Sequence, residues 1–531
     1  MAVRGGRGIY MKRKLRYYAG DKIIEKDVNY IPVRFILAVM LAVMETLAVI
    51  AAVVLLSMYV PYFYLLMWIT EIACVIQISA SNENPDYKVP WLLVVLTVPV
   101  AGLMLYFMFH SRVLKKKYIR RMEKLKSHAY KKDDEEAFER LKEENTTAAN
   151  QAKLLCEISE SHLFRHTSQE YFPLGEDMFA KMTEDLENAN TFIFLEYFII
   201  EEGKFWNTIL DILKKKAASG VEVCVVYDDI GCMNTLPGNY FKILRSYGIK
   251  AAPFSLLRGN ADSEFNNRSH RKILVIDGKV GYTGGVNLAD EYIGEKICFG
   301  HWKDTGIRLE GEAVRELTRL FLLDYGLNVR KEPEMCHDYF PDFEKQQEEG
   351  YMIPFGDGPS PVYTHQVGKR VIQNLLNQAE KYVWMMSPYL IIDSELCCSI
   401  EYAAMRGLDV CIIIPHIPDK KLVFEMTRYY YERLMKAGVK IYEYAPGFIH
   451  AKCYLADGDT AMIGTINLDY RSLAHHFENG VWMYKCASIK DIHADFEKTF
   501  DASVRMEKHM LKTGLLHKLV RSLVKIFAPM L

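Results

Sequence analysis

The stretch SHRKILVIDG at residues 269–278 decides the fold, because its pattern returns as HAKCYLADG at residues 450–458. Each copy has the spacing H-x-K-x4-D, in which a histidine precedes a lysine by two positions. The residues are His270, Lys272 and Asp277 in the first copy, and His450, Lys452 and Asp457 in the second. Since side chains alternate between the two faces of a strand, we expect each histidine to share a face with its lysine.

The agreement between the two copies continues beyond the aspartates. Glycines follow at Gly284 and Gly464, and asparagines follow at Asn287 and Asn467, at equal distances from the two aspartates. Each aspartate also begins an Asp-Gly pair between apolar runs, which is a strong hairpin signal. The predicted hairpins would bring the glycines and asparagines back beside the histidines and lysines.

The repeat covers more of the chain than these hairpins. The runs NTFIFLEYFI (190–199) and SGVEVCVVYDD (219–229) precede the first copy, and KYVWMMSPYLI (381–391) and RGLDVCIIIPH (406–416) precede the second. Short β-rich apolar runs that alternate with helical segments are typical of α/β domains with buried sheets. We therefore expect two tandem α/β domains, related by a pseudo-twofold axis, that bring both histidines into one cleft.

The region from residue 34 to 110 has a different composition. It holds three apolar runs, the first of which is FILAVMLAVMETLAVIAAVVLLSMYV, and each approaches or exceeds the roughly 20 residues that cross a bilayer. The sequence thus predicts a multi-pass protein of the cell membrane with an N-terminal helical membrane region. Basic clusters on both sides favour cytoplasmic ends and an even number of crossings. Since there are three runs, we leave the number at two or three and expect a cytoplasmic catalytic region.

These patterns divide the chain into six parts. The net charge of −1 gives no sign of a nucleic-acid partner, whereas the basic and apolar faces of the last segment predict a helix lying on an anionic lipid surface. The parts are a basic N-terminal segment (1–33), the membrane region (34–110), a charged connecting helix (111–151), the two α/β domains (152–345 and 346–510) and a C-terminal amphipathic helix (511–531).

The duplicated motif with its trailing glycine and asparagine resembles the phospholipase D superfamily, and the chain as a whole resembles its bacterial cardiolipin synthase branch. The segments NNRSHRKILVIDGKVGYTGGVNLADEY (266–292) and PGFIHAKCYLADGDTAMIGTINLDYRSLAHHFENG (446–480) carry the resemblance. It implies two phospholipase D-like domains and the transfer of a phosphatidyl group between two phosphatidylglycerol molecules in the membrane. The products would be cardiolipin and glycerol, formed through a phosphatidyl-histidine intermediate.

The resemblance also implies roles for individual residues. His270 would be the nucleophile and His450 the general acid and base, although the symmetry of the repeat leaves the reverse assignment open. Phosphodiester transfer needs a nucleophile, a proton donor and cationic stabilisation, so no metal and no cofactor are expected. The supporting residues are as follows: Lys272, Lys452, Asn287 and Asn467 bind the phosphate; Asp277 and Asp457 belong to the catalytic motif but hold the turns; Glu196 and Glu478 orient a histidine; and Gly284 and Gly464 complete the motif.

Three alternatives remain open at this point. First, another acceptor could replace the second phosphatidylglycerol: water, which would make the enzyme a phospholipase D, or a different alcohol. Second, some relatives are nucleases. Third, a non-catalytic membrane scaffold could retain the fold. The adjacent His475 and His476 can place one ring at most in the cleft, and we expect packing or surface roles for them. The oligomeric state is not predicted.

Overall fold

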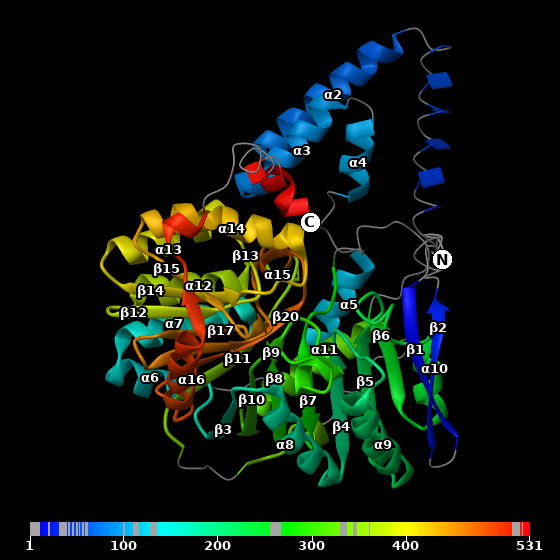
Figure 1. Cartoon of the computed structure of the whole chain (residues 1–531), viewed down its shortest axis with the longest axis vertical. Helices are drawn as coiled ribbons and strands as arrows, with labels where there is room; N and C mark the ends of the chain where they lie inside the picture. The colour runs from blue at the N-terminus through cyan, green and yellow to red at the C-terminus, as the bar shows by residue number, and fades with distance from the viewer. Residues whose placement is uncertain are drawn as a thin grey trace, which may run out of the picture.

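The computed structural model describes two large sheets that lie side by side and a group of helices projecting from them (Figure 1). The described residues are 11–19, 22–30, 62–98, 101–109, 116–127, 135–254, 267–329, 337–343, 348–360, 362–511, 521–522 and 524–530, with scattered positions between 40 and 58.

The first sheet has seven strands, of which the last three in the order are parallel and the others antiparallel. Its order is β3 (Thr167–Phe172), β10 (Gly306–Gly311), β8 (Val280–Gly284), β7 (Lys272–Ile276), β4 (Phe192–Tyr197), β5 (Glu222–Asp228) and β6 (Lys250–Phe254). Its helices are α8 (Gly175–Glu187), α9 (Lys204–Ala218), α10 (Tyr240–Ser246) and α11 (Val314–Asn328).

The second sheet repeats this order and adds an eighth strand at its edge. It runs β11 (Tyr351–Asp357), β20 (Glu478–Tyr484), β18 (Thr460–Gly464), β17 (Cys453–Ala456), β12 (Tyr382–Met386), β14 (Asp409–Pro415), β15 (Lys440–Tyr444) and β21 (Ser503–Arg505). Its helices are α12 (Val367–Gln378), α13 (Ser394–Met405), α14 (Lys421–Lys436), α15 (Tyr470–Ala474) and α16 (Ile489–Asp501). The predicted α/β class and the repeated strand order are both present.

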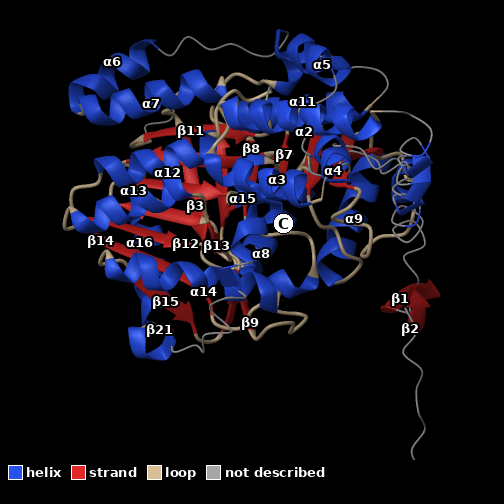
Figure 2. Ribbon diagram, turned by 90° about the horizontal axis from the view of Figure 1, so that it is seen from above, coloured by secondary structure: helices blue, strands red, loops and turns tan. Residues whose placement is uncertain are grey.

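The two halves share one hydrophobic core. Phe194 of the first sheet and Met385 of the second belong to the same cluster of buried side chains, together with Phe321 of α11. Figure 2 shows α11 lying over the sheets, and its side chains are buried along nearly the whole helix. The halves therefore form one unit in which residues of either half can complete a site in the other.

Both predicted hairpins form, between β7 and β8 and between β17 and β18. Asp277 and Gly278 have φ values of 53° and 65°, and Asp457 and Gly458 have 52° and 78°. Two successive residues with positive φ are what the tightest hairpin turns require, which is why Asp-Gly occupies both turns.

Short strands also join the two halves directly. β9 (His301–Lys303) of the first half pairs in parallel with β16 (Gly447–Ile449) of the second, and an isolated bridge joins Ser269 to Phe477. The β9–β16 pair precedes His450, and the bridge precedes His270. Each histidine is thus placed by backbone pairing with the other half.

The N-terminal part differs in several places from the expected arrangement. The basic segment contains a hairpin of β1 (Met11–Ala19) and β2 (Lys22–Tyr30), and the single connecting helix is replaced by α5 (Lys116–Ser127), α6 (Glu135–Glu144) and α7 (Thr146–Ser159). Asn145 explains the break before α7, because its side-chain oxygen accepts hydrogen bonds from the backbone of Thr147 at 2.9 Å and Ala148 at 3.0 Å.

The predicted membrane region lies only partly within the described residues. It contributes α2 (Phe63–Ala80), α3 (Pro85–Thr97) and α4 (Ala101–Phe109), whereas most of the first apolar run and most of the predicted C-terminal helix lie outside them. Among the described residues, no helix combines the length and apolarity needed to cross a membrane. The turn between α2 and α3 docks on the second half, where Asn84 donates a hydrogen bond to Asp393 at 2.9 Å.

Candidate active site

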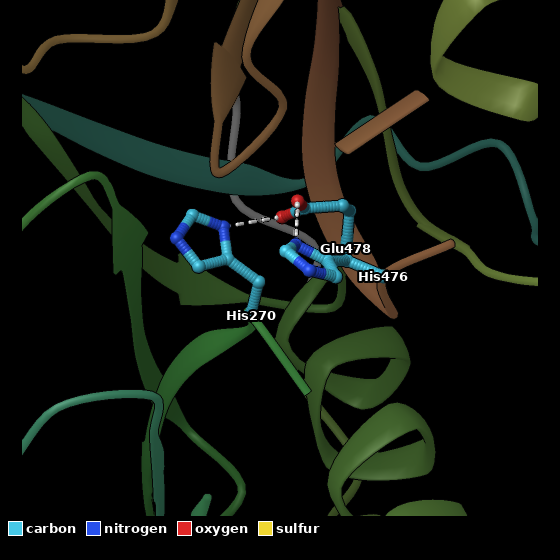
Figure 3. A group of neighbouring side chains, drawn as sticks. All are labelled: His270, His476 and Glu478. Carbon is cyan, nitrogen blue, oxygen red and sulfur yellow. Dashed lines mark hydrogen bonds and ion pairs between the residues drawn. The ribbon is translucent and has the colours of Figure 1, made fainter. Parts of the chain in front are cut away.

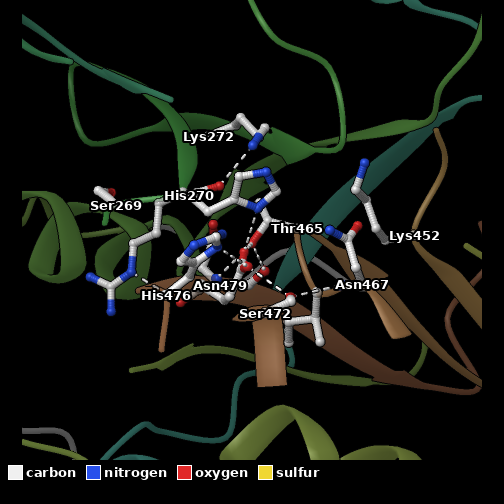
Figure 4. A network of polar contacts seen from close by, with 12 residues as sticks. Ser269, His270, Lys272, Lys452, Thr465, Asn467, Ser472, His476 and Asn479 are labelled. Carbon is white, nitrogen blue, oxygen red and sulfur yellow. Dashed lines mark hydrogen bonds and ion pairs between the residues drawn. The ribbon is translucent and has the colours of Figure 1, made fainter. Parts of the chain in front are cut away.

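Both H-x-K segments lie at the seam between the two halves. Lys272 is the first residue of β7, and Lys452 immediately precedes β17 (Figure 4). Each histidine stands two residues before its lysine. Lys272 donates a hydrogen bond to the carbonyl oxygen of His270 at 2.8 Å, so histidine and lysine share a face as expected. Arg271 points the other way and forms a buried ion pair with Asp324 at 2.8 Å.

Glu478 of the second half holds His270 of the first. Nδ1 of His270 lies 2.9 Å from Oε2 of Glu478, and the backbone N–H of His270 donates to the carbonyl of Phe477 at 2.8 Å. The Glu478 carboxylate also accepts hydrogen bonds from Thr465 and from Ser472, the latter at 2.7 Å. The prediction that Glu478 orients a histidine agrees with this geometry.

Asp304 plays the corresponding part for His450, and sequence reasoning missed it. Nδ1 of His450 lies 2.6 Å from Oδ2 of Asp304, and the backbone N–H of His450 donates to the carbonyl of Lys303 at 2.7 Å. Asp304 stands two residues before Gly306, as Glu478 stands two before Gly480, and these glycines pair with Gly284 and Gly464.

The missed signal is present in the sequence. It is the match between D-T-G at residues 304–306 and E-N-G at residues 478–480, which becomes visible once both segments are aligned on the strand that follows the hairpin.

Glu196 does not orient a histidine, contrary to our expectation. It accepts a hydrogen bond from Ser269 at 2.6 Å, within the buried side of the first sheet. Burial, reinforced by the neighbouring Asp324 carboxylate, raises the pKa of Glu196 well above its usual range. The position equivalent to Glu478 is therefore Asp304 and not Glu196.

Two buried lysines supply the positive charge of the site. Burial, followed by the charge of Lys452, lowers the pKa of Lys272 to about 7, and burial lowers the pKa of Lys452 to about 8. Because the charge of Lys452 contributes to the lowered pKa of Lys272, the two ammonium groups are close enough to repel each other. Such a pair of desolvated cations favours the binding of an anion, which restores both to the charged state.

The two histidines are uncharged at neutral pH. Burial lowers the pKa of His270 to about 3 and, together with the charge of Lys452, holds the pKa of His450 well below its usual range. A neutral imidazole whose Nδ1–H donates to a carboxylate keeps a lone pair on Nε2. His270 therefore presents a nucleophilic nitrogen.

The surroundings of the two rings differ. Nδ1 of His450 contacts the ammonium group of Lys452 at 2.6 Å in addition to Asp304. In contrast, the ammonium group of Lys272 donates to the backbone oxygen of His270. Burial raises the pKa of Asp304 to about 6. Burial also acts to raise the pKa of Glu478, but the interaction with the His270 ring, including its hydrogen bond, outweighs it and holds that pKa well below its usual range.

The two asparagines are not equivalent either. Asn287 accepts the backbone N–H of Ile199 at 3.1 Å and donates to the hydroxyl of Tyr292 at 2.7 Å, and the Tyr292 ring meets His450 edge-on with centroids 5.6 Å apart. In contrast, Oδ1 of Asn467 is buried without a hydrogen-bond partner among the described residues. Figure 4 places the Asn467 side chain beside Lys452 and facing the region of the His270 ring.

The motif glycines allow the strands after each hairpin to approach closely. A Cβ atom at Gly284 would lie 2.4 Å from the carbonyl oxygen of Thr305, and one at Gly464 would lie 2.3 Å from that of Asn479. Since these carbonyls directly follow Asp304 and Glu478, any larger residue would displace the carboxylates.

The motif aspartates lie at the far ends of their hairpins and hold turns. Asp277 accepts backbone hydrogen bonds from Asn190, Thr191 and Phe192 at 2.7–2.9 Å. Asp457 does the same for residues 380–382 at 2.7–2.9 Å. The structural role expected for them agrees with these contacts, and neither contacts a motif histidine or lysine in the described part of the chain.

Replacing Asp277 by alanine is therefore expected to lower stability and leave the chemistry intact. Loss of a carboxylate that accepts three backbone bonds should lower the free energy of unfolding by about 2 kcal/mol. Thermal unfolding in detergent measures this, with Lys279→Ala at an exposed position of the same turn as a control. A thousandfold loss of turnover with unchanged melting would contradict the assignment.

His476 faces the site, whereas packing or surface roles were expected for both adjacent histidines. Its ring centroid lies 5.7 Å from that of His270, and its Nδ1 lies 3.8 Å from Oε1 of Glu478. Because residues two apart on an extended chain share a face, His476 follows Glu478 into the site. His475 packs against Tyr87 of α3, with ring centroids 6.2 Å apart.

Comparison with known proteins places this geometry in context. Residues 182–297 and 372–500 match the family model described as cardiolipin synthase, PLD-like domain, and residues 71–109 match the one described as phospholipase D-nuclease N-terminal. The first match contains His270, His450 and Glu478, whereas Asp304 lies just beyond its first segment.

Curated relatives extend the similarity over most of the chain. A cardiolipin synthase of Geobacillus sp. is 34% identical over 86% of this chain and 91% of its own length. A cardiolipin synthase of Halalkalibacterium halodurans is 31% identical over 88% of this chain and 94% of its own length. Among solved structures, a phosphatidylserine synthase from Haemophilus influenzae superposes with a TM-score of 0.54 at 17% identity, over 73% of this chain and 98% of its own, which shows a shared fold.

Proposed function

Because the chain belongs to the cardiolipin synthase family, we propose that the centre around His270 and His450 transfers a phosphatidyl group from one phosphatidylglycerol to another. The protein is a phosphatidyl-transferring enzyme of the cardiolipin synthase family. The observation that carries the proposed site is the reciprocal arrangement in which each histidine is held by a carboxylate of the other half, around two buried lysines.

In the first step, Nε2 of His270 attacks the phosphorus of a phosphatidylglycerol. A P–N bond forms while the P–O bond to the glycerol headgroup breaks, and His450 in its protonated form gives its proton to the departing oxygen. Lys272 and Lys452 stabilise the negative charge that builds on the phosphoryl oxygens. The arriving phosphodiester supplies the negative charge that raises the pKa of His450, so that it can carry this proton.

In the second step, a glycerol hydroxyl of another phosphatidylglycerol attacks the phosphorus. His450, now neutral, accepts the hydroxyl proton, the new P–O bond forms and the P–N bond to His270 breaks. Cardiolipin leaves, and both histidines return to their starting protonation states. One phosphodiester replaces another, so the cycle needs no nucleotide.

The differences between the two rings support His270 as the nucleophile. Its Nδ1 meets an ionised carboxylate, which fixes the proton on Nδ1 and increases the basicity of Nε2. Nδ1 of His450 is shared between Asp304 and the Lys452 ammonium, an arrangement that suits a group whose proton comes and goes. Asn467, with its unsatisfied buried oxygen, is placed to contact the bound lipid headgroup.

We further propose that the two phospholipase D-like domains face each other across a pseudo-twofold axis and work on the cytoplasmic side of the cell membrane, behind an N-terminal membrane region. The repeated strand order of the two sheets supports the pseudo-twofold relation, and the basic clusters on both sides of the apolar runs support the cytoplasmic side. Support for the membrane region comes from α2, on which Leu66, Trp68 and Ile76 are each at least 60% exposed. Large exposed apolar side chains on one element mark a lipid-facing surface. Protease treatment of sealed inside-out vesicles is expected to digest the region after residue 135, and full protection would contradict this orientation.

Lipid product analysis tests the reaction itself. The purified protein, in mixed micelles with phosphatidylglycerol, is expected to form cardiolipin and glycerol in equal amounts. Phosphatidic acid as the main product would make water the acceptor and the enzyme a phospholipase D. Cleavage of single-stranded DNA at a comparable rate would instead favour a nuclease.

The depressed lysine pKa values predict an alkaline loss of activity. Below its pKa each lysine carries the charge that attracts the phosphodiester, and that charge is lost as pH rises through about 7 for Lys272 and about 8 for Lys452. We expect kcat/KM for phosphatidylglycerol to fall at least tenfold from pH 7 to pH 9.5, because kcat/KM reports groups of the free enzyme.

Lys272→Arg provides the control for this prediction, since an arginine remains charged throughout that range. The variant is expected to start from a lower rate but to lose less activity on the alkaline side. A wild-type profile that stays flat to pH 9.5 would show that the lysines remain charged in the empty site and would contradict the prediction.

A further inference from the structure

His476 converts part of the site into a set of metal ligands. Among the described residues, His270, His476 and Glu478 form a group whose ligand atoms all lie within 4.8 Å of one another. Figure 3 shows both rings directed at the Glu478 carboxylate, with His270 Nδ1 at 2.9 Å from Oε2 and His476 Nδ1 at 3.8 Å from Oε1. We propose that this group binds a zinc ion and that the bound ion inhibits the enzyme, an effect that rests on the proposed function.

The donor atoms select the class of metal. Two imidazole nitrogens and one carboxylate oxygen form a set that zinc uses with a fourth, open position. Magnesium and calcium prefer oxygen donors and larger numbers of them. Ligands at zinc bond lengths in a tetrahedron lie about 3.3 Å apart. The two imidazole–carboxylate separations, 2.9 Å to Oε2 and 3.8 Å to Oε1 of Glu478, bracket that value, and all three ligand atoms lie within 4.8 Å of one another. Side-chain rotations then bring one set of donors to zinc bond lengths.

The surroundings allow access and limit the affinity. The His476 side chain is 13% exposed, whereas that of Glu478 is fully buried, so His476 forms the outer ligand of the group. The nearby Lys272 and Lys452 repel a dication, while Arg271 and Arg268 are paired with Asp324 and Asp228. We therefore expect reversible binding that is weaker than in a structural zinc site.

The proton on His270 explains why a bound ion would inhibit. In the working site, that proton lies on Nδ1 and points to Glu478, which leaves the Nε2 lone pair for phosphorus. Zinc on Nδ1 requires the lone pair there, so the single ring proton moves to Nε2. No proton is released, but His270 then has no lone pair to attack with, and Glu478 is bound to the metal.

A binding measurement tests the site without reference to activity. The full-length protein in detergent, stripped of metal, is titrated with zinc in competition with a chromophoric chelator. We expect one zinc per chain in the wild type and at least tenfold weaker binding in His476→Asn and His476→Gln. His475→Asn changes the neighbouring histidine that packs on Tyr87, and it should bind zinc as the wild type does. Equal binding by the wild type and both His476 variants would overturn the proposal.

An inhibition assay tests the consequence. Each variant is compared with its own zinc-free rate of cardiolipin formation, so a change in basal rate does not affect the result. Zinc is expected to inhibit the wild type and His475→Asn at concentrations at least tenfold below those needed for His476→Asn, and magnesium at equal concentration should not inhibit. Equal inhibition of all three by zinc, or inhibition by magnesium, would contradict the proposal.

The two arms separate this inference from the proposed function. If zinc binds as expected but no variant forms cardiolipin, the metal site stands and the proposed reaction fails. If cardiolipin forms and zinc does not bind, the reaction stands and the metal site is wrong.

Discussion

Replacing His270 by alanine is expected to lower the rate of cardiolipin formation by at least about a thousandfold, because the residue that forms the covalent intermediate has no substitute in the site. The loss should appear in kcat, since the lysines that bind the phosphodiester remain. The rate is measured by lipid product analysis in mixed micelles with phosphatidylglycerol. The His270 side chain is buried against Phe198, with ring centroids 4.9 Å apart, so His270→Asn is included as a variant that leaves a smaller cavity.

The matched control is His475→Ala. It removes a histidine that packs against Tyr87 of α3, outside the reacting centre. It is expected to keep turnover within about threefold of the wild type while changing the contact with α3. If His270→Ala retained a tenth of the wild-type rate with unchanged thermal unfolding, His270 could not be the nucleophile.

Asp304→Asn is expected to lower turnover by about a hundredfold or more. The amide leaves the shape of the site nearly unchanged, but it can no longer accept the Nδ1 proton of His450 as a carboxylate does or stabilise the charged ring. General acid and base catalysis contributes 10²–10⁴-fold to such reactions, and most of that contribution depends on the orientation and charge of the imidazole. Steady-state kinetics with phosphatidylglycerol measures the effect.

Glu196→Gln is the control that distinguishes this account from the sequence-based expectation. Both carboxyl groups are buried in the first half, but Glu196 contacts Ser269 and Asp304 contacts a histidine. The Glu196 variant should therefore keep turnover within about tenfold of the wild type. A larger loss in Glu196→Gln than in Asp304→Asn would reverse the two assignments.

The repeat in the sequence was sufficient to predict the α/β class and the hairpins. It also identified the histidines, lysines and asparagines, because these depend on local spacing. A strand with an H-x-K start and an Asp-Gly end leaves little freedom in where its side chains point. The same reasoning assigned Asp277 and Asp457 to turns, where the structure has them.

The carboxylates that hold the histidines could not be obtained in this way. Asp304 and Glu478 reach His450 and His270 only because each half pairs its backbone with the other through Lys303 and Phe477. That pairing is a tertiary contact between residues more than 140 positions apart. The resemblance to the family suggested Glu196 for this role, whereas its actual partner is the serine before His270.

The covalent intermediate tests the central claim most directly. The purified enzyme is mixed with phosphatidylglycerol, quenched during turnover under conditions that preserve P–N bonds, and digested for mass spectrometry. The account predicts a phosphatidyl group on the peptide that contains His270, present in the wild type and absent in His270→Ala. A phosphatidyl group on the peptide that contains His450, or cardiolipin formation by His270→Ala at the wild-type rate, would contradict it.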